Sequence, residues 1–121
     1  PIADHGPPIR LDPVGDDSLA ERIQRTFPEA RVVKTLNTVN ASVMVDPAAV
    51  PGSHDVFMAG DDGDAKATVR SLLQEMGWAA GNIRDLGGIS SARGLEMYLV
   101  LWLGLAGSLG RYDLNIHVVT P

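Results

Sequence analysis

Apolar residues recur at helical spacing in three segments of the chain, and residues typical of helix ends stand beside them. Before the first segment, Ser18 and Glu21 have the spacing of a capping box, in which the serine side chain satisfies a free backbone N–H. Gly77 follows the second segment, where a C-terminal cap belongs. The third segment is apolar on almost every side, which is typical of a helix buried in a core or in an oligomer interface. The pattern predicts helices over 18–27, 65–76 and 91–109.

Short apolar runs between these helices predict strands over 31–36, 55–60 and 83–86. After the last helix, residues 114–118 alternate between apolar and polar side chains, which is typical of a half-exposed strand. Residues 41–50 have a weaker pattern that fits one helical turn followed by a proline-containing loop. The alternation of helices and strands predicts an α/β fold with right-handed crossovers.

The ends of the predicted strands are where a ligand site is expected. If the first three strands run parallel, their carboxyl ends share one edge of the sheet, and open α/β sheets bind ligands outside that edge. Three segments would then lie together, namely 37–41, 60–64 and 87–93. The first of them, with the sequence NTVNA, offers two amide side chains, a hydroxyl group and free backbone groups. A plain polar turn is an equal alternative for this segment.

Two of these segments carry charged residues that could bind a ligand. Residues 60–64 contain three aspartates, which would suit a divalent cation. The rest of a calcium loop is missing and aspartates also cap helices, so we interpret them as caps and predict no metal site. Arg93 stands in the first turn of the last helix, where its positive charge opposes the helix dipole. It is therefore a candidate to hold an anion or a carbonyl-bearing ring, with an ion pair to Glu96 as the equal alternative.

Composition and charge limit the class of protein. The chain has 121 residues, 45% of them hydrophobic and 21% charged, which suffices for the core of one folded domain. A net charge of −5 disfavours nucleic-acid binding, and the absence of cysteine excludes disulfides and thiolate chemistry. Residues 1–17 predict an irregular arm before a domain over 18–121. No signal peptide or membrane span is predicted, so we expect a soluble, cytoplasmic protein.

Three segments resemble, in the same order, the C-terminal half of one family of Rossmann-type reductases. They are VVKTLNTVNASVMVDP (32–47), DVFMAGDDGDAKATVRSLLQEMGW (55–78) and ISSARGLEMYLVLWL (89–103). The family is the NADPH-dependent deazaflavin (coenzyme F-420) reductases and related NADP oxidoreductases, and the cytosolic domain of the STEAP-type metalloreductases is more distantly similar. The resemblance implies an incomplete Rossmann-type, doubly wound and mostly parallel sheet, with a long apolar C-terminal helix and a final strand.

The resemblance also implies a function and a site. Members of the family transfer hydride between NADP(H) and a flavin-like or deazaflavin ring. The protein aligns two rings in such a transfer and needs no side-chain acid or base, so no catalytic residue is predicted. A homodimer through the helix over 91–109 is implied as well. Matching by motif places against the nicotinamide Asn37, Thr38, Val39, Asn40 and Ala41, and against the second ring Arg93 and Met97.

Departures from the family pattern leave an alternative open. The chain has no GxGxxG turn and no P-loop, so the main NADP anchor would lie in a missing N-terminal half. A chain that begins at Pro1 rather than at methionine agrees with that expectation. Asn37 stands where members that act on deazaflavin often have histidine, so a flavin or a quinone-like acceptor is possible. The alternative function is a non-enzymatic, dimerising α/β domain that has lost cofactor binding.

Overall fold

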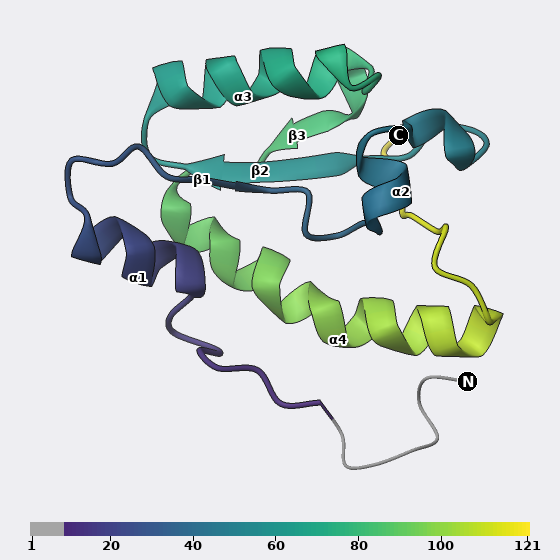
Figure 1. The fold of residues 1–121 in the computed structure, drawn as a ribbon, viewed down its shortest axis with the longest axis horizontal. Helices are drawn as coiled ribbons and strands as arrows, with labels where there is room; N and C mark the ends of the chain where they lie inside the picture. The colour runs from purple at the N-terminus through teal and green to yellow at the C-terminus, as the bar shows by residue number, and fades with distance from the viewer. Residues whose placement is uncertain (1–8) are drawn as a thin grey trace.

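The computed structural model describes residues 9–121, so the first eight residues of the predicted arm lie outside the described part of the chain. A small three-stranded sheet lies between two layers of helices, with α3 on one face and α1 and α4 on the other (Figure 1). The predicted α/β class is confirmed. In chain order the elements are α1 (Leu19–Thr26), β1 (Val33–Thr35), α2 (Ala41–Met44), η2 (Pro47–Ala49), β2 (Val56–Gly60), α3 (Gly63–Glu75), η3 (Ala80–Asn82), β3 (Ile83–Asp85), η4 (Ile89–Ser91) and α4 (Ala92–Leu109).

The sheet is mixed, which corrects the prediction of a mostly parallel sheet. The strand order is β1-β2-β3. β1 and β2 are antiparallel, with Val33 opposite Gly60. β2 and β3 are parallel, with Val56 opposite Ile83. Parallel neighbours need a crossover that returns the chain across the sheet, usually a helix. The 13-residue α3 provides that crossover between β2 and β3, but the link between β1 and β2 contains only single helical turns.

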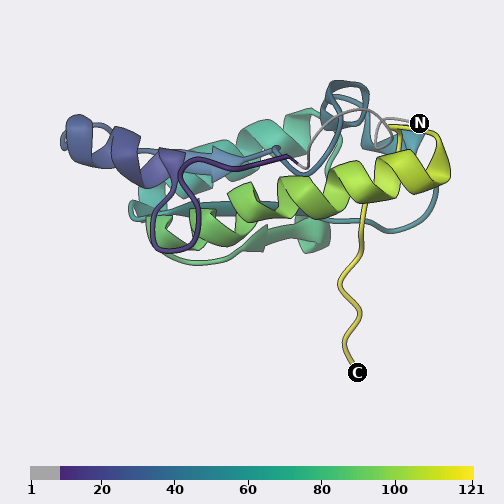
Figure 2. The same ribbon diagram turned by 90° about the horizontal axis from the view of Figure 1, so that it is seen from below.

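The predicted final strand is wrong, because residues 114–118 lie beside the sheet without forming a strand with it. Figure 2 shows the C-terminal segment leaving the helical layers and ending away from them. The segment is attached at Asp55, whose N–H donates to the Ile116 carbonyl (2.9 Å) and whose carboxylate accepts from the Val118 N–H (2.7 Å). A side-chain carboxylate thus takes a place that a backbone carbonyl would occupy in a strand ladder.

The central strand β2 is buried on both faces, because its alternate side chains enter two separate cores. Val56 and Met58 pack on the α3 side in a cluster that includes Leu73. Phe57 and Ala59 point the other way and pack with residues of α1 and α4.

Local signals located most helix boundaries correctly. Ser18 is the N-cap of α1, and its Oγ accepts from the Glu21 N–H (3.1 Å), as the capping box predicts. Asp62 caps α3 by accepting from the Ala65 N–H (2.8 Å). Gly77, just beyond α3, has a φ of +112°, a conformation that favours glycine.

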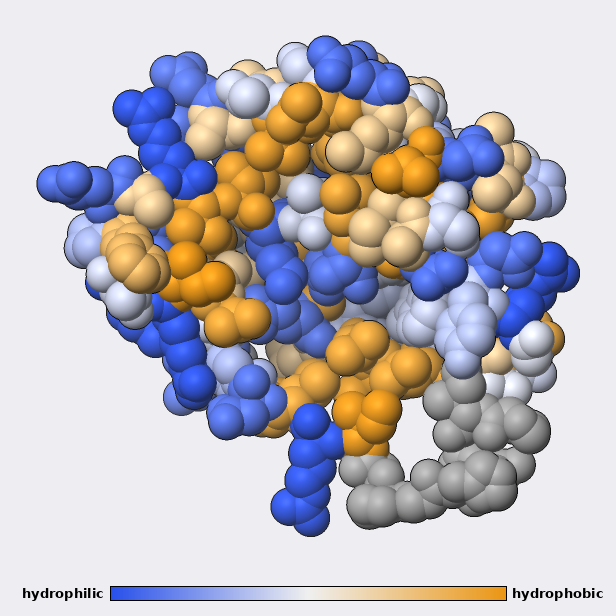
Figure 3. All heavy atoms as spheres, viewed as in Figure 1, coloured by the Kyte–Doolittle hydropathy of each residue, from blue (hydrophilic) through white to orange (hydrophobic). Residues whose placement is uncertain are grey.

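The long helix α4 buries only three of its residues and exposes several large apolar side chains. Its buried residues are Ala92, Leu95 and Ala106, of which Ala92 and Leu95 pack with Phe57 and Ala59 of β2. The exposed apolar residues of α4 are Met97, Leu99, Val100, Leu101 and Leu109. Figure 3 shows hydrophobic patches at the surface between strongly polar side chains. Within residues 9–121, no helix has the length and apolar character needed to cross a membrane. The predicted oligomer interface would use the exposed apolar residues of α4 that lie away from Leu95, namely Met97, Val100 and Leu101.

Candidate functional site

The antiparallel direction of β1 divides the predicted ligand site between two edges of the sheet. Two of its three segments do meet, since the Gly60 N–H donates to the Gly87 carbonyl (3.0 Å) and Asp61 Oδ1 accepts from the Ile89 N–H (2.9 Å). The third segment, 37–41, follows the opposite end of β1. The expected convergence of all three segments is therefore wrong, because it assumed that β1 and β2 run parallel.

Residues 37–41 instead approach α4, which crosses the face of the sheet. Asn37 Nδ2 donates to the Leu95 carbonyl at 2.7 Å. Arg93 and Met97 lie two residues before and after Leu95, and at about 100° per residue they share a side of the helix that is roughly opposite Leu95. The structure thus brings the loop 37–41 to the turn of α4 that contains Arg93 and Met97, but these two side chains lie on the side of that turn away from the loop.

The loop 37–41 begins with a strained backbone and contains buried polar atoms. Leu36 has a φ of +66°, a left-handed conformation that is unfavourable for a residue with a branched side chain and that turns the chain sharply after β1. Thr38 and Val39 are buried. Asn37 Oδ1 and Thr38 Oγ1 are both shielded from solvent and have no hydrogen-bond partner within residues 9–121. Unpaired buried polar atoms are costly, and strained backbone is concentrated at functional sites.

The second half of the loop starts α2. The Asn40 carbonyl accepts from the N–H groups of Val43 (2.9 Å) and Met44 (3.0 Å), and Asn40 Nδ2 donates to Ser42 Oγ (2.9 Å). Ala41 is exposed at the first position of the helix. The backbone at 40–41 is therefore held by a short helical turn, which presents a small side chain to the surface.

Arg93 is held by a residue of α1 and not by its own helix. Its Nε and Nη2 donate to the two carboxylate oxygens of Glu21 at 3.0 and 2.8 Å, a bidentate pair. These hydrogen bonds from Arg93 are the main reason that the pKa of Glu21 is lowered, against the opposing effect of desolvation. The side chain of Arg93 is still 38% exposed.

The alternative for Arg93, an ion pair with Glu96, is not formed, because Glu96 caps α1. Its two oxygens accept from the backbone N–H groups of Leu19 (2.7 Å) and Ala20 (3.0 Å), which are free at the start of that helix. Sequence reasoning missed both long-range roles, since Glu21 and Glu96 lie more than 70 residues from their partners. The only local sign was Arg93 in the first turn of a helix, where the helix dipole disfavours a positive charge.

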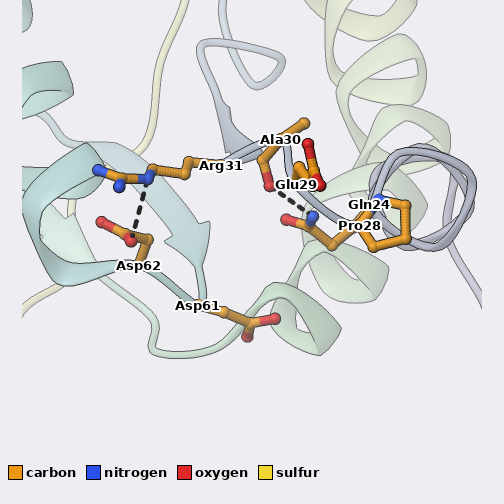
Figure 4. A pocket seen from close by; sticks show the side chains of 7 residues that line it. All are labelled: Gln24, Pro28, Glu29, Ala30, Arg31, Asp61 and Asp62. Atoms are coloured by element: carbon orange, nitrogen blue, oxygen red, sulfur yellow. Dashed lines mark hydrogen bonds and ion pairs between the residues drawn. The ribbon is translucent and has the colours of Figure 1, made fainter.

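The aspartate-rich segment 60–64 borders an open hollow of about 460 Å³ between α1 and the start of α3. Figure 4 shows Asp62 directed toward Arg31, whose Nε is 3.6 Å from its carboxylate, and Asp61 directed away from both. Asp61 and Asp62 are already used as backbone acceptors, which agrees with the capping interpretation. Among residues 9–121, no three histidine, aspartate or glutamate side chains are grouped as metal ligands.

Comparison with solved structures relates the chain to a reductase. A candidate F-420-dependent NADP-reductase from Arthrobacter sp. FB24 is 51% identical in sequence and superimposes with a TM-score of 0.90. The match covers 98% of this chain but 53% of the reductase, so this chain spans about half of the length of its relative. No protein-family description and no curated protein matches the chain.

The fold and the match together define the chain as an α/β domain with a small mixed sheet that is homologous to part of this reductase. Identity of 51% over nearly the whole chain is homology, and the resemblance to the F-420-dependent NADP-reductases is confirmed. The chain corresponds to about half of such a protein.

Proposed function

We propose that this chain is part of an oxidoreductase that transfers hydride between NADP(H) and a flavin-like or deazaflavin ring. The observation that carries the proposal is the 51% identity to a relative named for both NADP and F-420. The remaining strands of a Rossmann-type sheet, with a glycine-rich turn that anchors the dinucleotide, would come from a part of the protein outside these 121 residues. The site requires no side-chain acid or base from this chain.

The loop 37–41 is proposed to line the nicotinamide, because its chemistry suits a polar ring substituent. Asn37 Oδ1 is an acceptor and the Thr38 hydroxyl can donate or accept, and neither has a partner within the described residues. NADP(H), when bound, supplies or accepts the hydride. Val39 and Ala41 would provide apolar contact, and the side chain of Asn40 would border the ring. These residues would orient the ring and exclude water, which is the contribution that a protein makes to hydride transfer.

Arg93 and Met97 are proposed to meet the second ring on the outer side of α4. Glu21 holds the guanidinium in one orientation through two hydrogen bonds, so less side-chain freedom is lost when a ligand binds. Met97 is 38% exposed one helical turn further on, and its flexible thioether suits contact with an aromatic ring. Nη1 of Arg93, which makes no hydrogen bond to Glu21, would bind a carbonyl or anionic group of the acceptor.

A homodimer through the helix over 91–109 is part of the proposal, because the outer side of α4 exposes several large apolar residues. The second candidate function is a non-enzymatic, dimerising α/β domain that has lost cofactor binding. It is favoured by the absence of a GxGxxG turn from these 121 residues.

The two functions are distinguished by titrating NADPH against this chain and against a version extended at its N-terminus to the length of the Arthrobacter relative. We expect the extended protein to bind NADPH and this chain alone to bind far more weakly. Binding by neither protein would eliminate the oxidoreductase and leave the non-enzymatic domain.

The role of Arg93 is tested by Arg93→Ala in the extended protein, with Glu21→Gln as the matched control. Both substitutions weaken the ion pair between α1 and α4, but only the first removes the guanidinium. We expect Arg93→Ala to raise the KM for the ring acceptor by about tenfold, the effect of losing one charge-assisted hydrogen bond, with little change in the KM for NADPH. Equal changes in the KM for the acceptor in both variants would assign Arg93 a purely structural role.

A further inference from the structure

The C-terminal segment 114–118 is attached to the two residues that precede β2, His54 and Asp55. Asp55 is fully buried and binds the segment through its N–H, to the Ile116 carbonyl, and through its carboxylate, to the Val118 N–H. These two bonds set the position of Asn115 along the sheet edge. The neighbouring residue, His54, is 7% exposed.

The amide of Asn115 determines which ring nitrogen of His54 carries hydrogen. Asn115 Nδ2 lies 2.7 Å from the Asp55 carbonyl and 2.7 Å from His54 Nδ1. A carbonyl only accepts hydrogen bonds, so the group beside it must be the NH2 of the amide. The second hydrogen of that NH2 is directed at Nδ1, which therefore has no hydrogen of its own. The hydrogen of the neutral ring must be on Nε2.

The Nε2–H of His54 has an acceptor in the right place. The Pro47 carbonyl lies 2.7 Å from Nε2, at the start of η2. Trp78, whose ring packs edge-on against the imidazole with centroids 5.2 Å apart, donates from Nε1 to the Met44 carbonyl at 3.0 Å. Two ring N–H groups thus bind two carbonyls of the segment 44–47, at the end of α2 and the start of η2.

This segment directly follows the loop 37–41 and shares a core with it. Val39, in the loop, and Val43, in α2, pack in one buried cluster with Trp78. Because α2 has only four residues, its own hydrogen bonds are too few to hold it in place. It is held by the burial of Val43 and by the hydrogen bonds that its end and the start of η2 accept from Trp78 and His54.

We propose that Asn115 is a positioning residue that selects the Nε2–H tautomer of His54 and thereby fixes α2 and the loop 37–41. The C-terminal segment, which makes no strand, acts as the clamp that holds this tautomer. The tautomer and the clamp do not depend on what the protein does, whereas their effect on NADPH binding rests on the proposed function.

The tautomer is tested by 15N NMR of the imidazoles in this chain. We expect a pyrrole-like signal from Nε2 and a pyridine-like signal from Nδ1 of His54, with the signals assigned through His54→Gln. A hydrogen on Nδ1 in the unsubstituted chain would overturn the inference. This measurement needs no variant of Asn115 and so does not depend on whether such a variant folds.

The clamp is tested by Asn115→Ala, with His117→Ala as the matched control on the same segment. His117 contacts Asp55 (3.2 Å) but makes no hydrogen bond to His54. We expect Asn115→Ala to increase amide hydrogen exchange at Val43 and Met44 by at least fivefold relative to the control, at matched global stability, an effect of about 1 kcal/mol. Equal exchange rates in the two variants would overturn the clamp.

The catalytic consequence is measured in the N-terminally extended protein. We expect Asn115→Ala to raise the KM for NADPH severalfold, whereas His117→Ala leaves it unchanged. If the unsubstituted extended protein does not bind NADPH, the proposed function fails while the NMR and exchange results still decide the clamp. If it binds and Asn115→Ala has the same KM, the link from the clamp to the site fails.

Discussion

Asp55 should be the most sensitive charged position for stability, because four donors converge on its buried carboxylate. Oδ1 accepts from Asn82 Nδ2 (2.8 Å) and His117 Nδ1 (3.2 Å). Oδ2 accepts from Arg84 Nε (2.9 Å) and the Val118 N–H (2.7 Å). The donors come from η3, β3 and the C-terminal segment, so one carboxylate joins three parts of the fold.

Asp55→Asn is the smallest change that removes this charge. The amide keeps the volume of the side chain, but its NH2 group would face two donors that it cannot accept from. Removing one partner of a buried ion pair costs about 3–5 kcal/mol. Arg84 is 33% exposed and can be partly hydrated, so we expect the lower end, about 3 kcal/mol. For a chain of this size the melting temperature should fall by roughly 10–15 °C.

The pH dependence of the effect identifies its electrostatic part. Burial raises the pKa of Asp55, but the hydrogen bonds from Asn82, Val118, Arg84 and His117 outweigh it, and the pKa falls from 3.8 to about 2. A lowered pKa stabilises the folded state above the unfolded pKa, and the stabilisation is lost as the pH falls through the folded value. The shift corresponds to about 2 kcal/mol at neutral pH.

Urea unfolding of the unsubstituted protein and of Asp55→Asn, between pH 7 and pH 2, measures the loss of stability and its dependence on pH. Asp113→Asn is the matched control, since it removes a carboxylate from a more exposed ion pair with Arg111. The difference in the free energy of unfolding between the unsubstituted protein and Asp55→Asn should be large at pH 7 and should shrink below about pH 4. The reasoning would be refuted if Asp55→Asn lost no more stability than the control, or if its loss of stability stayed constant down to pH 2.

Two further predictions concern packing and helix ends. Gly60→Ala places a Cβ 2.8 Å from the Val32 carbonyl and should lower the free energy of unfolding by about 1–3 kcal/mol. The added Cβ of Gly63→Ala meets no atom within 4 Å, so this variant should be as stable as the unsubstituted protein or slightly more stable. Thermal unfolding compares the two variants directly. Glu96→Ala leaves the first N–H groups of α1 without acceptors and should lower the free energy of unfolding by about 1–2 kcal/mol, with faster amide exchange in α1; unchanged exchange there would show that Glu96 is not its cap.

The elements of this fold were predictable because their signals are local. Ser18, Asp62 and Gly77 each satisfy or relax a helix end within three residues, and the burial of β2 on both faces follows from its own apolar run. Strand direction has no such signal. Whether β1 and β2 run parallel depends on the path of the link between them, and that path turns at Leu36, where the sequence has no glycine.

The candidate site was only partly predictable for the same reason. The residues of the loop 37–41 stand out as a polar break after a strand, and Arg93 stands out as a misplaced charge. Their partners do not, because Glu21 and the Leu95 carbonyl are far away in the sequence. The alternation in 114–118 predicted a strand that does not form, and the segment is instead attached to the buried carboxylate of Asp55, the residue before β2.

Distant side chains therefore decide the geometry of the site more than its own secondary structure does. The strand before the loop 37–41 has three residues and the helix after it has four, and elements of this size are not stable alone. The loop is held by α4, through the Leu95 carbonyl, and its continuation is held by His54 and Trp78. Hydride transfer depends on the alignment of two rings to within a fraction of an ångström, and a misplacement of about 1 Å costs about 100-fold in rate. Under the proposed function, substitutions at these supporting residues should consequently slow hydride transfer in the N-terminally extended protein, even though none of them would touch a ligand.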